Sequence, residues 1–314
     1  MLTERRSTKI GAALLVFATV LRLLLGAPVL RGDEPLLSIQ KLPFVPTQAP
    51  TVPTEPGSIM PTIPIFGASD ADKTQLRYSC DYRVDVGKLL EQRLQWELDD
   101  GQPAVLIVHT HGSESYTKEL GQTYQETAQY RTLDEHHNMV AVGDLLADLL
   151  EEAGIRVIHD RQLHDYPSYT SSYNNSRKSV KEYLKEYPSI RLVLDLHRDA
   201  GENSDGSQFA THAKVDGKDS AQIMFLVGTD ESGNYHPAWK DNLAVAAKLN
   251  VLMEGLNPGI TRKTTLRAQR FNQDLAEIAL LVEVGSAGNT LQEALTAIPI
   301  LAEAIIALKN GANW

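Results

Sequence analysis

The feature that most constrains the fold is a series of short apolar runs that alternate with helix-forming stretches over residues 105–308. The runs are short enough to be buried strands, and they occupy 105–108, 155–158, 192–196, 224–227 and 278–284. Between them, apolar residues recur at helical spacing, which predicts helices at 139–150, 179–187, 242–256 and 291–308. Strands that alternate with helices in this way predict an α/β fold, a three-layer sandwich with a mostly parallel sheet.

The N-terminus carries a membrane-targeting pattern. Three basic residues precede an apolar run, 10–30, which Arg22 interrupts. A spanning helix needs about 20 mostly apolar residues, and a positive flank favours a cytoplasmic N-terminus. We therefore expect residues 1–31 to be a single-pass anchor that is not cleaved, with the rest of the chain extracytoplasmic. A cleaved signal peptide is the alternative.

Residues 32–66 hold eight of the chain's 15 prolines, which favours an extended, semi-rigid linker. A hydrolase or binding domain is then expected at 67–314. With six basic and four acidic residues, segment 1–66 has net charge +2, so the chain's total of -10 leaves -12 for the domain. This acidity argues against a nucleic-acid binder. The single cysteine, Cys80, can form neither an intramolecular disulfide nor a thiolate-rich metal site.

Polar side chains that suit a metal site follow the predicted strands. His109, His111 and Glu114 follow the first run, His197 follows the third, and Glu283 lies within the last. Because ligands of open α/β sheets bind beyond the carboxyl ends of the strands, these residues are expected to lie near one another.

The chemistry that these residues share is zinc hydrolysis. A catalytic zinc takes three protein ligands, commonly imidazole and carboxylate, and keeps a position for water. His111 and Glu114 would supply two ligands from one loop and His197 a third, with His109 as the alternative to His111. Glu283 would be the general base, since a carboxylate on an apolar strand is costly to bury without a role.

Each residue also has a structural interpretation. His197 could be a core histidine that donates to a backbone carbonyl, and residues 195–199 could form a surface turn. Glu283 could pair with a nearby arginine in a structural salt bridge. Each interpretation is the safer one when its residue is taken singly. Their shared position at strand ends favours the metal site.

Further residues are candidates for contacts with the substrate. Arg198 and Arg270 could stabilise an oxyanion or bind a peptide carboxylate. Tyr169 belongs to a tyrosine-rich segment that could form a sugar-facing wall, although a packed loop is the alternative. We also expect Asn289 to contact the substrate.

Several ordered motifs resemble the stage II sporulation protein P family over roughly residues 100 to 310. They are His109-Thr-His-Gly-Ser-Glu-Ser-Tyr116, Asn138-x-x-x-Val-Gly143, His159-Asp160 with His164-Asp165-x-Pro-Ser-Tyr169, Asp195-Leu-His-Arg-Asp199, and Leu281-Val-Glu-Val-Gly285 with Asn289. The resemblance implies the fold of the amidase and carboxypeptidase-like zinc hydrolases.

The resemblance also implies an activity. It is that of a zinc-dependent N-acetylmuramoyl-L-alanine amidase with additional endopeptidase activity, which acts on septal peptidoglycan during engulfment in endospore-forming bacteria. One histidine of the pair His109 and His111, together with His197 and Glu283, would be essential. In ordinary cell-wall amidases the glutamate ligand lies at the start of the next helix, so Glu135 and His137 are alternatives to Glu114.

The implied partners are stage II sporulation protein D, a glycan-cleaving enzyme, and the membrane scaffold protein M of the same stage. Two other functions stay open for the same residues. One is a metal-free, wall-binding scaffold, and the other is a zinc carboxypeptidase acting on peptide termini.

Overall fold

The computed structural model describes residues 63–313. The expected anchor at 1–31 and most of the linker at 32–66 lie outside these residues and stay predictions. Within residues 63–313, no helix is both long and apolar enough to cross a membrane. Phe66 is buried, and its amide N–H donates to Oδ1 of Asn313 at 2.7 Å. The packed part of the chain therefore includes Phe66, and the two ends of the domain meet.

The elements follow the alternating order that the sequence predicts, with additions. The strands are β1 (Leu76–Ser79), β2 (Val105–Val108), β3 (Val157–His159), β4 (Leu192–Asp199), β5 (Ala213–Val215), β6 (Lys218–Ser220), β7 (Ile223–Gly228), β8 (Thr264–Arg267) and β9 (Ile278–Ser286). The helices are α2 (Val86–Glu91), α3 (Met139–Glu152), α4 (Ser172–Glu186), α5 (Trp239–Leu256) and α6 (Leu291–Ala307), with short 3₁₀ helices η1 (Ala68–Lys73) and η2 (Tyr169–Ser171). The sequence did not predict β1, β8 or the β5–β6 hairpin, and α4 begins seven residues before the predicted 179.

Seven strands form one sheet in the order β1-β8-β7-β9-β4-β2-β3. Every neighbouring pair is parallel except β7 and β9, which are antiparallel. The mostly parallel sheet is confirmed. The one antiparallel junction places the carboxyl ends of β4 and β9 at the same edge as the starts of β7, β8 and β1.

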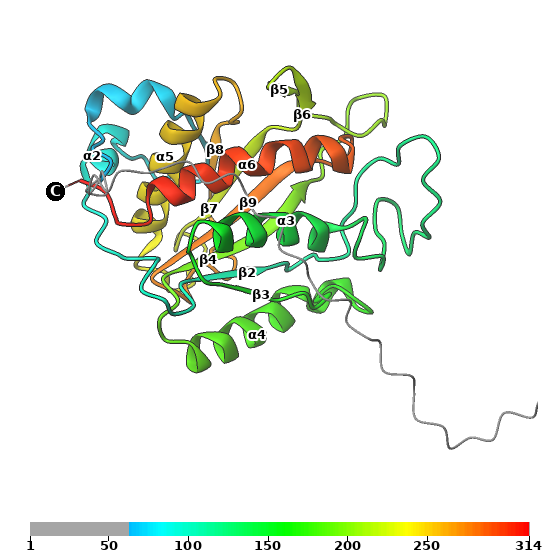
Figure 1. Ribbon diagram of the computed structural model, residues 1–314, viewed down its shortest axis with the longest axis horizontal. Helices are drawn as coiled ribbons and strands as arrows, with labels where there is room; N and C mark the ends of the chain where they lie inside the picture. Colours follow the sequence, from blue (N-terminus) through cyan, green and yellow to red (C-terminus); the bar gives the residue numbers. More distant parts are fainter. Residues whose placement is uncertain (1–62, 314) are drawn as a thin grey trace, which may run out of the picture. The chain divides into compact units, whose positions relative to one another are not determined.

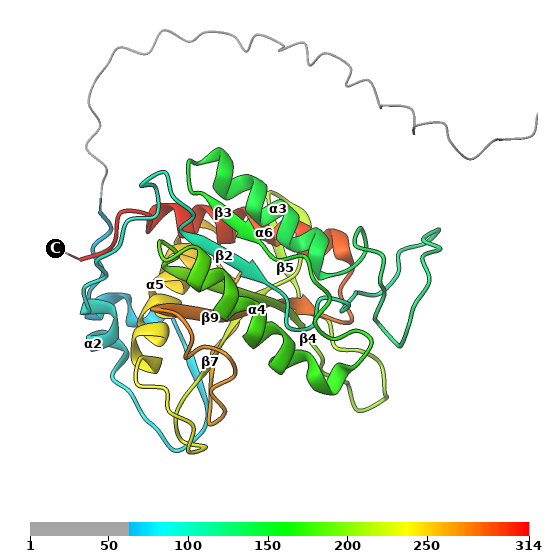
Figure 2. The same cartoon turned by 90° about the horizontal axis from the view of Figure 1, so that it is seen from below.

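The sheet lies between two layers of helices, which gives three layers in all (Figures 1 and 2). α3, α5 and α6 lie on one face, where they pack against one another and build the larger apolar core. α4 lies on the other face and packs against β2 over a small core that includes Val108, Val180 and Val193. The predicted three-layer α/β sandwich is therefore the observed fold.

Local sequence signals set the ends of the helices near the site. The side chain of Asn138 caps α3 by accepting from the amide of Val140, and Gly154 follows the helix with φ of 86°. Thr290 and Glu293 form a reciprocal capping box at the start of α6. α3 and α6 thus begin at defined residues beside the loops that follow β2 and β9.

Candidate active site

The loop after β2 is fixed by two aspartates, of which Asp165 is buried and Asp195 is partly buried. Asp195 on β4 accepts hydrogen bonds from the amide of Thr110 at 2.7 Å and from its hydroxyl at 2.6 Å. Asp165 accepts from the amide and the hydroxyl of Ser113 at 3.1 and 2.6 Å. His111 lies between these two anchors, so its position is held from both sides.

His111 lies in a cage of aromatic rings. Its ring stacks on Tyr169, with centroids 4.5 Å apart, and meets Tyr173 and His197 edge-on at 5.6 and 5.2 Å. Burial lowers the pKa of His111 to about 4, although Glu114 opposes this shift. Its Nδ1 is buried and has no hydrogen-bond partner among the described residues. A neutral imidazole with a free nitrogen is the form that binds a metal.

His109, the alternative to His111, has both ring nitrogens engaged. Nδ1 lies 3.2 Å from the carbonyl oxygen of Leu196, and Nε2 lies 2.8 Å from Nε2 of His159. The ring is fully buried beneath α3, where a Cβ on Gly143 would lie 2.6 Å from His109 Nε2. This packing favours a structural role for His109 and leaves His111 as the better candidate ligand.

Glu114 is buried among cations. Oε2 lies 3.6 Å from Nδ1 of His197, while Oε1 lies 3.7 Å from guanidinium nitrogens of both Arg131 and Arg198. Burial favours the neutral acid, but His197 and Arg198 outweigh it and hold the pKa of Glu114 at about 2. Glu114 is therefore a carboxylate at neutral pH and lies beside the two histidines, as its spacing in the sequence predicts.

His197 lies between two carboxylates. Its Nε2 is 3.0 Å from Oδ1 of Asp195, but the atoms are not aligned for a hydrogen bond, so Nε2 has no partner in the described chain. Burial opposes the charge on the imidazole, but Asp195 and Glu114 raise the pKa of His197 well above its usual range. A positive charge at His197 is therefore favoured electrostatically, whether it is a proton on the ring or a metal ion bound to the ring.

Glu283 lies on β9 directly beside His197, its Cα partner on β4. The side chain is buried and Oε2 has no hydrogen-bond partner among the described residues. Burial raises the pKa of Glu283 to about 8, and Glu114 adds to this effect while His197 opposes it. Such a buried, unpartnered carboxyl is typical of a catalytic acid or base.

Zinc fits this donor set chemically. Within residues 63–313, no three side chains of His, Cys, Asp or Glu lie close enough together, as they are positioned, to hold a metal ion. However, Nδ1 of His111, Nε2 of His197 and Oε2 of Glu283 are all buried without partners, whereas most buried polar atoms are paired. With Glu114 beside them, they offer the imidazole and carboxylate ligands that zinc prefers. Side-chain rotations would be needed to bring them onto one ion.

The alternative ligands before α3 have other partners. The Glu135 carboxylate accepts from Nη2 of Arg161 at 2.6 Å and is partly exposed. His137 pairs with Asp134 at 2.9 Å and stacks on Tyr124. Neither contacts His111 or His197, so the geometry favours Glu114 over both.

The two candidate arginines have structural partners. Arg198 is buried, and its Nε and Nη2 donate to the carbonyl oxygens of Ser115 and Tyr130, both at 3.0 Å. It therefore positions Glu114 and the surrounding loop instead of presenting free donors. Arg270 pairs with Asp274 at 3.2 Å in a separate cluster. Neither arginine shows the free guanidinium that the oxyanion role requires.

Tyr169 lies at the site, as expected. One face of its ring packs on His111, and the guanidinium of Arg131 lies 4.1 Å from the ring centroid. Asn289, by contrast, is fully buried, and its amide group bonds to Thr211, Ser286 and Glu293. Asn289 therefore fixes the loop between β9 and α6 and has no exposed atom to offer a substrate.

Three supporting residues received no role from the sequence. Strand alternation could have indicated Asp195, since it lies two residues before His197 and shares its face of β4. Arg131 and Asp165 come from irregular loops, and no spacing rule connects them with the histidines. Arg131 links Glu114 and Asp165. Its Nη2 lies 3.7 Å from Glu114 and its Nη1 lies 3.7 Å from Asp165.

Two solved structures of amidases are similar to this chain at low identity. N-acetylmuramoyl-L-alanine amidase AmiC2 of Nostoc punctiforme is 12% identical, with a TM-score of 0.40 over 65% of this chain and 96% of that chain. The CwlD amidase from Clostridioides difficile, solved in complex with the GerS lipoprotein, is 13% identical, with a TM-score of 0.39 over 66% and 95% of the two chains.

One curated relative and one family model are similar in sequence. Stage II sporulation protein P from Bacillus subtilis (strain 168) is 32% identical over 201 residues, which is 60% of this chain and 47% of the relative. The match thus spans about half the length of that relative. The family model described as Stage II sporulation protein P matches residues 67–306, most of the described domain. The chain therefore belongs to the stage II sporulation protein P family.

Proposed function

We propose that this chain is a zinc-dependent peptidoglycan hydrolase that cleaves the amide between N-acetylmuramic acid and the L-alanine of the stem peptide, with additional endopeptidase activity. The observation that carries the proposal is the meeting of three unpartnered buried atoms, on His111, His197 and Glu283, at the carboxyl ends of β2, β4 and β9. Membership of the stage II sporulation protein P family supports the choice of substrate.

Three side chains would hold the zinc: His111, Glu114 and His197. When bound, the ion supplies a Lewis acid that polarises the amide carbonyl and lowers the pKa of water. Asp195 orients the site because it holds the His111 loop through Thr110 and lies 3.0 Å from His197. This site suits a dication, because Asp195 and Glu114 together bring two negative charges.

Glu283 would move the proton. In its ionised form, which the positive charge of a bound dication would favour, Glu283 accepts a proton at Oε2 from the water that attacks the carbonyl carbon and returns it to the amide nitrogen as the C–N bond breaks. The products are a lactyl carboxylate and a free L-alanine amine, so hydrolysis needs no other reactant. Tyr169, which is half-exposed above His111, would exclude water from one side of the site.

The biological setting belongs to the same proposal. The protein would act at the sporulation septum and engulfing membrane, held there by residues 1–31, and would thin the septal wall. Stage II sporulation proteins D and M are the proposed partners. The family assignment supports this setting.

Digestion of purified peptidoglycan by the full-length chain in detergent tests the proposal. The reaction is run with chelator, with zinc restored, and with Glu283→Gln, and the products are identified by mass spectrometry. Peptides with a free L-alanine N-terminus, released only with zinc and an intact Glu283, are the expected result.

Glu277→Gln is the matched control, because Glu277 is exposed and immediately precedes β9. It should digest the wall like the unmodified chain. Release of only C-terminal amino acids would indicate a carboxypeptidase. Walls that stay intact under every metal condition would overturn the enzyme proposal in favour of a binding protein.

A further inference from the structure

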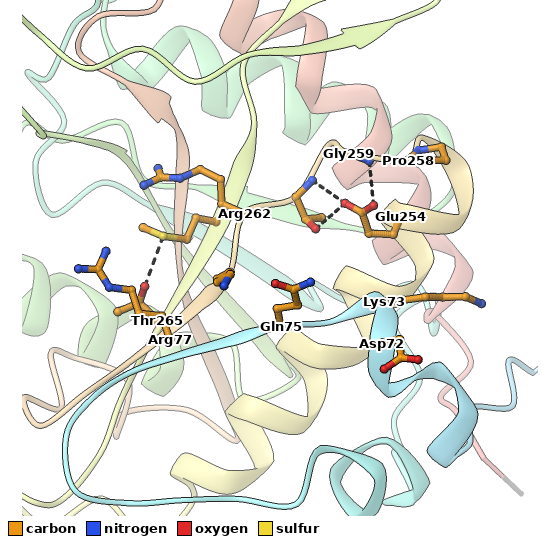
Figure 3. A pocket seen from close by; sticks show the side chains of 12 residues that line it. Asp72, Lys73, Gln75, Arg77, Glu254, Pro258, Gly259, Arg262 and Thr265 are labelled. Atoms are coloured by element: carbon orange, nitrogen blue, oxygen red, sulfur yellow. Dashed lines mark hydrogen bonds between the residues drawn. The ribbon is translucent and has the colours of Figure 1, made fainter. Parts of the chain in front are cut away.

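A large open cavity lies beside the candidate active site and has no role in the chemistry described above. It has a volume of about 710 Å³ and is lined by the starts of β1 and β7, the residues around the start of β8, and the loop that follows α5. Figure 3 shows Arg77, Arg262 and Thr265 on one side of it and Lys73 on another.

The cavity shares a face of the sheet with Glu283. Met224, which lines it, is the Cα partner of Glu283 across the β7–β9 ladder, and His197 is the partner of Glu283 on the other side. Residues that are partners in a ladder project from the same face. The hydroxyl of Thr265 then contacts Sδ of Met224 at 3.5 Å, which continues the row onto β8.

A second contact joins the cavity to the end of β4. Nη2 of Arg262 donates to Oδ2 of Asp199 at 2.7 Å, two residues after His197. Nη1 of Arg262 is buried and lacks a hydrogen-bond partner in residues 63–313. The wall of the cavity is therefore continuous with the strand that carries a candidate zinc ligand.

Basic residues outnumber acidic residues in the lining of the cavity. The two oxygens of Glu254 are engaged by the loop, because they accept from the amides of Gly259 and Thr261 and from the Thr261 hydroxyl. Asp72 is the other acidic residue in the lining.

Four basic residues line the cavity: Lys73, Arg77, Arg262 and Lys263. Lys73 pairs with Asp70 and Arg262 with Asp199. Arg77 and Lys263 have no acidic partner within 4.0 Å in the described part of the chain, although the domain as a whole is strongly acidic. Arg77 and Lys263 therefore have donors that are free to bind a negatively charged ligand.

Distances fit a short peptide. β1 lies three strand positions from β9, and neighbouring strands are about 4.8 Å apart, so Arg77 is about 14 Å across the sheet from Glu283. Lys263, just before β8, is about 10 Å away by the same spacing. An extended peptide of about four residues covers this span at roughly 3.4 Å per residue.

We propose that this cavity binds the carboxylates of the acidic stem peptide whose first amide is cleaved at Glu283, with Arg77 and Lys263 as the main contacts. The proposal rests on the proposed function for the identity of the peptide. It adds a specificity site: stem peptides with free carboxylates would be preferred to those in which the carboxylates are amidated.

Direct binding to the full-length chain in detergent tests this inference without turnover. The probes are the product tetrapeptide L-Ala–γ-D-Glu–L-Lys–D-Ala and the same peptide with its C-terminal carboxylate amidated. The free acid should bind about fivefold more tightly to the unmodified chain, as an exposed ion pair allows. Arg77→Gln/Lys263→Gln should remove this preference.

Lys181→Gln/Lys185→Gln on α4 is the matched control, since it removes two exposed lysines away from the cavity. It should keep the preference for the free acid. Thermal melting of both double variants checks that the fold is intact.

A wall-digestion assay separates this inference from the proposed function. If the enzyme is active, Arg77→Gln/Lys263→Gln should raise KM more than it lowers kcat. An active enzyme that binds both peptides equally would overturn the carboxylate site and leave the amidase standing. A chain without hydrolase activity that still prefers the free acid through Arg77 and Lys263 would support the site and overturn the amidase.

Discussion

His197 on β4 and Glu283 on β9 are partners in a parallel ladder and project from the same face of the sheet. The expected ligand and the expected base are therefore held at a separation set by backbone hydrogen bonds between two buried strands. A loop movement cannot alter this spacing, whereas the His111 loop depends on its anchors at Asp195 and Asp165.

This relationship predicts that metal binding and proton transfer can be separated. Glu283→Gln should bind zinc like the unmodified chain but lose about 10²–10⁴-fold in kcat, since the amide cannot accept the proton. His197→Ala should lose both zinc and activity. Metal analysis by mass spectrometry beside the digestion assay provides the measurement, and loss of zinc from Glu283→Gln would show that Glu283 is a ligand.

Zinc affinity should also distinguish the proposed ligands from their alternatives. His111→Ala and Glu114→Ala should weaken zinc binding by more than about 100-fold, beyond the effect of losing a supporting residue. His137→Ala and Glu135→Ala should not, because those side chains pair with Asp134 and Arg161 instead. Competition with a chromogenic chelator measures the zinc affinity of each variant. If the variants of Glu135 or His137 lose affinity and that of Glu114 does not, the third ligand lies at the start of α3.

The two histidines of the loop should respond differently to removal. His109→Ala breaks contacts to Leu196 and His159 and leaves a cavity, so it should lower the free energy of unfolding by about 2 kcal/mol or more. His111→Ala should lower it less in metal-free buffer, because the ring loses its packing on Tyr169 but Nδ1 has no hydrogen bond to lose. Urea unfolding compares them, and equal destabilisation would argue against separate roles.

Gly143 offers a test of how α3 packs on the histidine pair. A Cβ there would lie 2.5 Å from Nε2 of His159 and 2.6 Å from Nε2 of His109, so Gly143→Ala should destabilise the domain by about 1–3 kcal/mol. Gly255→Ala in α5 is the control. It meets no atom within 4 Å and should be neutral or stabilising by up to about 1 kcal/mol. Urea unfolding of both variants gives the comparison, and equal stability of the two would contradict this packing.

Strand-end positions made the candidate residues visible in the sequence. Val105–Val108 and β9 are buried on both faces, so they appear as continuous apolar runs and the polar residues that follow stand out. β1 and β8 were missed for the opposite reason. Arg77 and Thr265 face the open cavity, so β8 has a single apolar residue and β1 alternates over only four residues, too few to stand out in the sequence.

Other features depend on contacts that no local pattern encodes. The direction of β7 relative to β9 leaves no trace in an apolar run, which is the same for parallel and antiparallel pairing when both faces are buried. Arg198 and Asn289 looked like ligand-binding residues, yet their donors are taken by backbone carbonyls and neighbouring side chains. Only the tertiary structure shows which polar atoms are already satisfied.

A buried lysine far from the active site predicts a pH dependence of stability. Lys248 on α5 is almost fully buried, and its ammonium group donates to the carbonyl oxygens of Leu89 and Leu90 and lies 5.0 Å from the ring of Phe66. Burial lowers its pKa from 10.5 to about 8, and no acidic residue within residues 63–313 pairs with it.

Because the folded pKa lies below the unfolded pKa, the unfolded state binds more protons between pH 8 and 10.5. The cost of burying the charge is fully present below pH 8 and is relieved as the pH rises through this window. Each unit of pKa difference corresponds to about 1.4 kcal/mol. The free energy of unfolding of the unmodified chain should therefore rise relative to Lys248→Met from pH 8 to 10.5, as measured by urea unfolding. Since all other titrating groups are shared, parallel profiles for the two proteins would show that Lys248 keeps an ordinary pKa in the folded state.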